Sequence, residues 1–108
     1  DPRPLRVTDA GKENESIVTI EFEDGLLATI HLFMNIAPTF QISLFGKDRW
    51  RLIEIKNSYA MFRDNIIEFI RSVQEGRPRV PFNKTEQIIR VLIAAQESFQ
   101  QKGKTINL

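Results

Sequence analysis

The stretch from Ser16 to Met34 constrains the fold more than any other part of the sequence. It holds two runs in which apolar residues alternate with other residues, and the segment from Glu23 to Gly25 separates them. This period of two around a glycine-containing turn predicts a β-hairpin. A three-residue loop with Gly25 in the left-handed region keeps each face uniform, whereas a two-residue turn would mix the faces. The cross-strand pairs expected from the longer loop are Phe22 with Leu26, Ile20 with Ala28, and Val18 with Ile30.

The two faces of this predicted hairpin differ in character. One face is apolar and is expected to belong to the core; it consists of Val18, Ile20, Phe22, Leu26, Ala28, Ile30, Leu32 and Met34. The other face is half polar, yet too apolar for ordinary solvent-facing surface. It consists of Ile17, Thr19, Glu21, Leu27, Thr29, His31 and Phe33.

A second hairpin is predicted from Phe40 to Lys56, with a turn over Gly46 to Arg49. Its pattern places Ile42 opposite Ile53, with Phe45, Trp50 and Leu52 on the mixed side. Because each hairpin has one apolar face and one mixed face, we expect the two hairpins to share one antiparallel sheet of at least four strands. Residues 1–15, with two prolines and several charges, are expected to be an extended N-terminal segment with little fixed structure.

The apolar period changes to about 3.6 residues after Tyr59, which predicts a helix that ends at Gly76. A second helix is expected to start at Asn83, with Glu86 three residues later, and to end at Gly103. The tail from Lys104 to Leu108 fits a short edge strand. The sequence therefore predicts an α+β fold of one domain, 1–108, in which an open-faced antiparallel sheet carries two helices packed on one face.

Composition excludes several classes of function. Fifteen basic and fourteen acidic residues leave a net charge of +1, so nucleic acid is not an expected partner. No apolar run is long enough to cross a bilayer, so no membrane association is expected. The absence of cysteine removes disulfides and thiolate metal sites and favours a cytoplasmic location. The chain begins with Asp1 rather than methionine, which favours a piece of a longer protein.

The sequence offers little catalytic chemistry. Its five glycines stand alone, so no phosphate-binding Gly-rich loop is present. His31 is the only histidine, and a structural or interface role is favoured over a catalytic one. Glu21 and Glu23 share a strand face, but edge charges near a turn explain them better than an acid pair. We predict no catalytic, cofactor-binding or metal-ligating residue.

The basic residues Arg77, Arg79 and Lys84 surround two prolines. A solvated linker is favoured over an anion site for this cluster.

The mixed face is the remaining candidate for function. Both helices are needed on the other face, so no segment is left to cover this one, and an uncovered apolar and aromatic sheet face indicates an interaction surface. The candidate residues of a homo-oligomer interface are Leu27, Thr29, His31, Phe33, Phe45, Trp50 and Leu52.

Several segments resemble the glucose-fructose oxidoreductase, inositol dehydrogenase and MocA (Gfo/Idh/MocA) family. They are Phe62 to Pro78, Thr85 to Ser98, Gly103 to Leu108, the Phe22 to Gly25 turn, and Leu44 to Gly46. The resemblance covers roughly Ser16 to Leu108 and rests on patterned apolar positions. It implies the C-terminal α+β domain of an enzyme whose N-terminal Rossmann domain binds NAD or NADP and whose substrate is a sugar, cyclitol or related alcohol. It also implies that the open sheet face forms a subunit interface and helps to wall the substrate pocket.

The family's cofactor fingerprint, its Glu-Lys-Pro motif and its Asp-x-x-x-His pair are absent from this chain, so no catalytic residue is transferred to it. His31 has Leu27 four residues before it and does not match the family's histidine. Two alternatives stay open: a stand-alone dimerisation or ligand-binding module without enzymatic activity, and a small enzyme that uses His31 with a carboxylate of the same sheet face, such as Glu54.

Overall fold

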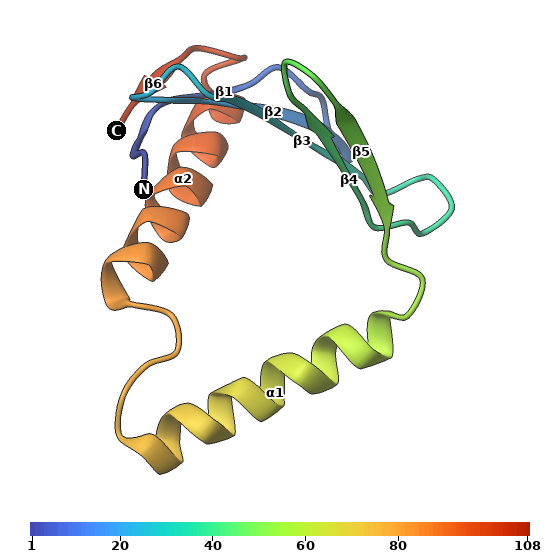
Figure 1. The fold of residues 1–108 in the computed structure, drawn as a ribbon. Coiled ribbons are helices and arrows are strands. Elements are labelled where there is room, and N and C mark those ends of the chain that lie inside the picture. Colours follow the sequence, from blue (N-terminus) through green and yellow to red (C-terminus); the bar gives the residue numbers. More distant parts are fainter. The chain divides into compact units, whose positions relative to one another are not determined.

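The computed structural model describes residues 1–108, which divide into two compact units. The first unit is Asp1–Ile36 with Val80–Leu108, and the second is Ala37–Arg79. The fold is α+β, with two helices, an antiparallel sheet of four strands and a separate two-stranded sheet (Figure 1). The elements are β1 (Pro4–Asp9), β2 (Glu15–Phe22), β3 (Leu27–Phe33), β4 (Gln41–Phe45), β5 (Trp50–Glu54), α1 (Ser58–Glu75), α2 (Phe82–Gln100) and β6 (Ile106–Asn107).

The four-stranded sheet of the first unit has the order β3-β2-β1-β6. Its β2–β3 hairpin has the predicted register, with Ile20 opposite Ala28 and Val18 opposite Ile30. Gly25 has a φ of 83°, which is the left-handed conformation that the three-residue loop requires. The alternation of apolar residues therefore determined this register correctly.

The prediction that residues 1–15 have little fixed structure is wrong. β1 lies in the sheet interior, between β2 and β6, and Val7 pairs with Ile20 on one side and Ile106 on the other. Pro4 opens the strand at a register shift, a position where the missing N–H is tolerated. The prolines therefore mark the start of a strand. The predicted edge strand in the tail is confirmed as β6.

The prediction that both hairpins share one sheet is also wrong. β4 and β5 form a two-stranded sheet of their own, with the predicted pairing of Ile42 and Ile53. In the larger sheet, β1 lies beside β2 on the side away from β3. The four strands of the larger sheet are thus supplied by the two ends of the chain, and not by the second hairpin.

α2 packs against β1 and β6, on the face of the four-stranded sheet that carries Val7 and Ile20. The buried core consists of Val7, Val18, Ile20 and Ala94. The helix begins at Phe82, one residue before the predicted start at Asn83, and no side chain caps it. Neither helix of the chain has the length and apolar character needed to traverse a bilayer.

α1 belongs to the second unit and has the predicted ends. The Asn57 side chain accepts a hydrogen bond from the Ala60 N–H at 3.0 Å, and Gly76 ends the helix with a φ of 65°. α1 buries none of its residues. That its apolar stripe covers the sheet stays a prediction.

Ser98 joins α2 to β1 through a buried polar contact. Its Oγ accepts a hydrogen bond from the Asp9 backbone N–H at 2.9 Å, and the Ser98 side chain is fully buried. We expect Ser98→Ala to lower the free energy of unfolding by about 1–3 kcal/mol, because a buried N–H loses its acceptor. Chemical denaturation followed by circular dichroism measures the change.

Ser72→Ala is the matched control. The Ser72 hydroxyl donates to the Phe69 carbonyl within exposed α1, and alanine is the better helix former. An equal loss of unfolding free energy in Ser72→Ala and Ser98→Ala would contradict the role given to Ser98.

Candidate functional site

The face of the four-stranded sheet opposite α2 is uncovered within the first unit. Because Val7, Val18 and Ile20 point into the core with α2, their strand neighbours point to the other side. The residues of this open face are Arg6 and Thr8 on β1, Ile17, Thr19 and Glu21 on β2, and Leu27, Thr29, His31 and Phe33 on β3. The mixed face predicted from the sequence is therefore a real face of the sheet.

The centre of the open face is polar, and its two charged residues pair with each other. Arg6 forms an ion pair with Glu21. Thr8, Thr19 and Thr29 lie side by side across three strands. The Thr8 hydroxyl hydrogen-bonds to the Thr105 hydroxyl at 2.9 Å. Because Arg6 and Glu21 pair with each other, these groups offer no unpaired charge to a ligand.

The edge of the open face along β3 is more apolar. Leu27 is 62% exposed, and Ile17 lies directly opposite His31. The His31 and Phe33 rings are tilted against each other with centroids 5.6 Å apart. His31 thus sits among apolar side chains, which fits the structural or interface role favoured by the sequence.

The three remaining interface candidates lie on the β4–β5 hairpin. Phe45 and Trp50 are cross-strand partners and Leu52 pairs with Ser43. Phe45 is 85% exposed and Trp50 is 72% exposed. The seven candidates therefore form two sets, four on β3 and three on the hairpin, in two different sheets.

Three features of the structure bear on the catalytic alternatives. Glu54, the carboxylate considered as a partner for His31, lies in the β4–β5 sheet, so the two do not share a sheet face. Glu21 and Glu23 are paired with Arg6 and Arg3, as edge charges beside a turn usually are. No three His, Asp or Glu side chains are grouped so that they could hold a metal ion.

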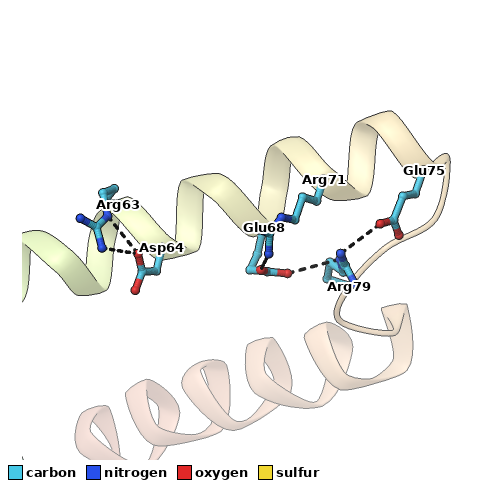
Figure 2. Close-up of polar contacts among 6 residues, drawn as sticks. All are labelled: Arg63, Asp64, Glu68, Arg71, Glu75 and Arg79. Carbon is cyan, nitrogen blue, oxygen red and sulfur yellow. Dashed lines mark hydrogen bonds and ion pairs between the residues drawn. The ribbon is translucent and has the colours of Figure 1, made fainter.

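The arginines of the linker after α1 are neutralised by that helix. Arg79 bridges Glu68 and Glu75 with nitrogen–oxygen distances of 3.3 and 3.0 Å (Figure 2). Arg77 also pairs with Glu75. Lys84 pairs with Asp1 in the first unit. The interpretation of these basic residues as an ordinary linker is therefore favoured over an anion site.

Sequence reasoning missed a depression of about 370 Å³ beside the β1–β2 turn, lined by Asp9, Gly11, Phe99 and Lys102 among others. The Asp9 carboxylate is buried, and its Oδ1 accepts a hydrogen bond from the Gly11 N–H at 2.9 Å. This is an Asx turn, in which an aspartate stabilises its own local backbone. The Asp-Ala-Gly sequence was the only available signal, and it fell in the segment expected to lack structure.

Glu15 connects the same turn to the segment after β3. Its carboxylate accepts a hydrogen bond from Asn35 Nδ2 at 3.0 Å and lies 3.2 Å from Lys12 Nζ. The Asn35 hydrogen bond, and then Lys12, lower the pKa of the partly exposed Glu15 carboxyl. Glu15 is therefore held as an anion, in a structural role rather than as a proton donor.

The comparisons with known proteins add no relative. No protein-family model, curated protein or solved structure matches the chain. Function is therefore argued from the residues themselves. The open sheet face and the exposed aromatic side of the hairpin are the two surfaces with the strongest claim to a partner.

Proposed function

We propose that this chain is the C-terminal part of an NAD(P)-dependent oxidoreductase of the Gfo/Idh/MocA type, in which it serves subunit assembly and helps to wall the substrate pocket. The observation that carries the proposal is that no helix of the first unit packs against the face of the four-stranded sheet opposite α2. The opposite face presents Ile17 and Leu27 to solvent. Large apolar side chains on an uncovered sheet face are typical of an interface between subunits.

The chain does not act alone in this proposal. A dinucleotide needs backbone N–H groups of a glycine-rich turn at the start of a helix, whereas α1 starts after Asn57 and α2 after Pro81. The starts of α1 and α2 therefore lack the glycine-rich turn that would hold the phosphates of NAD or NADP. The cofactor and the catalytic lysine belong to an N-terminal Rossmann domain, and the substrate class is a sugar, cyclitol or related alcohol.

The second candidate is a stand-alone dimerisation or ligand-binding module. The depression beside Asp9 is the observation in its favour. The sequence encoded upstream in the natural gene distinguishes the two. A strand followed by a Gly-rich turn supports the oxidoreductase, whereas a start codon immediately before Asp1 supports the module.

Charged substitutions test assembly through these surfaces. Ile17→Glu places a carboxylate in the apolar part of the open face, and Trp50→Glu places one on the aromatic side of the hairpin. We expect at least one of the two to raise the dissociation constant of the oligomer at least tenfold, because burying an unpaired charge in an interface is unfavourable. Light scattering across a concentration series measures this constant.

Leu26→Glu is the matched control, since Leu26 is exposed in the β2–β3 hairpin but lies outside the open face. It should leave the dissociation constant unchanged. An oligomer that tolerates both Ile17→Glu and Trp50→Glu would contradict assembly through these two surfaces.

A further inference from the structure

The outer edge of β3 is an unpaired row of backbone groups. β3 ends the sheet, and no strand pairs with its outer side. The backbone N–H of Phe22 donates to Leu26, and that of Met34 donates to Asn14, which fixes which residues bond inward to β2. Hydrogen-bonded and non-hydrogen-bonded pairs alternate along an antiparallel ladder. The backbone groups that bond to β2 are therefore those of Ala28, Ile30 and Leu32. The residues with outward N–H and C=O groups are Leu27, Thr29, His31 and Phe33.

This edge has none of the usual features that prevent strand addition. Natural proteins protect edge strands with lysine, proline, bulges or very short strands. β3 has seven residues, LATIHLF, with no proline, no bulge and no formally charged residue. Its exposed side chains include Leu27, Ile30 and Leu32. The edge is therefore open to another strand of similar apolar character.

We propose that β3 pairs antiparallel with β3 of a second copy of this chain, around a two-fold axis at Ile30, so that two four-stranded sheets become one sheet of eight strands. The expected cross-strand pairs are Leu27 with Phe33, Ala28 with Leu32, Thr29 with His31, and Ile30 with its own copy. This interface is formed by the backbone edge of β3, whereas the proposed function uses the side chains of the open face.

The register follows from the positions of the outward groups. A two-fold pairing must match outward residues with outward residues, and the Ile30-centred register uses all four of them on both copies. A register centred on Thr29 would place Phe33 opposite Gly25 in the turn. One centred on His31 would leave Leu27 without an outward partner and would stack two imidazoles.

The side chains favour a second copy as the occupant. In the Ile30-centred register, Leu27 meets Phe33 on the open face, and Ile30 meets Ile30 on the side of α2. Thr29 meets His31, which provides a hydroxyl beside an imidazole. Apolar residues thus meet apolar residues, and no two charges are opposed. The strand is complementary to itself.

A single cysteine tests the register directly. The residues at the axis form a non-hydrogen-bonded pair, whose Cα atoms lie about 4.5 Å apart, within the range that a disulfide spans. The chain contains no cysteine, so any disulfide of Ile30→Cys joins two copies. Oxidised glutathione should convert Ile30→Cys to a covalent dimer at least ten times faster than it converts Leu32→Cys.

Leu32→Cys is the matched control because it lies on the same face of the same strand. In the proposed register it faces Ala28 of the other copy, and two Leu32 positions are four residues apart, about 13 Å along the strand. A mixture of Ala28→Cys and Leu32→Cys should instead form the mixed disulfide. Equal rates for Ile30→Cys and Leu32→Cys, or no dimer of Ile30→Cys, would overturn the proposal.

Thr29→Pro tests the backbone pairing. Proline at this position removes an outward N–H and leaves the bonds between β2 and β3 intact. In the Ile30→Cys background it should abolish the covalent dimer while circular dichroism stays unchanged. A folded variant that still cross-links at the original rate would overturn the proposal. Ile17→Glu adds a charge to the open face and leaves the outward backbone groups of β3 unchanged. Loss of assembly through the open face can therefore be distinguished from loss of pairing at the β3 edge.

Discussion

Replacing Val7 by alanine should lower the free energy of unfolding by about 2–3 kcal/mol. Val7 is fully buried and contributes to a core of four buried apolar residues. It lies in the interior strand β1, between Ile20 and Ile106, so the lost methyl groups leave a cavity at the centre of the sheet. With so small a core, this is a large share of the stability of the first unit. Urea denaturation followed by circular dichroism measures the loss.

Val73→Ala is the same chemical change at an exposed site. Val73 lies on α1 and is 67% exposed, so little apolar burial is lost, and alanine favours a helix. The free energy of unfolding should change by less than about 0.5 kcal/mol. Similar losses at Val7 and Val73 would show that β1 is not part of the core.

Gly11→Ala should lower the free energy of unfolding by about 3 kcal/mol. A Cβ atom at Gly11 would lie 2.2 Å from the Glu15 carbonyl oxygen and 2.6 Å from the Ser16 Cα. Both are backbone atoms of the facing strand, so the β1–β2 connection would have to move. The gain from a less flexible unfolded chain, about 0.4–1 kcal/mol, is too small to offset this overlap. Thermal and chemical denaturation measure the net effect.

Gly46→Ala is the control for this substitution. A Cβ at Gly46 meets only the Arg49 carbonyl oxygen, at 3.2 Å, and a small shift of that turn relieves the contact. We expect the free energy of unfolding to change by less than about 1 kcal/mol. If Gly11→Ala is as mild as Gly46→Ala, the close approach of β1 to β2 at this turn is wrong.

The local pattern of the sequence predicted both hairpin registers and the end of α1. Gly25 and Gly76 have the left-handed conformations that their positions required, and apolar alternation selected one pairing in each hairpin. These features depend on residues close together in the chain. Such contacts can be read from period and turn chemistry alone.

Long-range pairing could not be predicted in the same way. β1 and β6 come from opposite ends of the chain and pair through Val7 and Ile106, and no local pattern indicates which strands will be neighbours. The buried contact between Asp9 and Ser98 also spans 89 residues. These two contacts explain why the N-terminal segment was misjudged and why the depression beside Asp9 was missed.

The candidate site was predicted in part. The four residues of β3 share the face that period two assigned to them. The three residues of the hairpin also share a face, but in a different sheet. The sequence pattern distinguished the two sides of each hairpin correctly, because side-chain direction depends only on alternation.

The solution mass of the 108-residue chain tests the central claim, that this chain is an assembly domain, most directly. Light scattering across a concentration series should give a mass that rises to at least twice the 12.5 kDa of one chain. A mass of 12.5 kDa at every concentration, for a chain that circular dichroism shows to be folded, would contradict self-assembly through both the open face and the β3 edge.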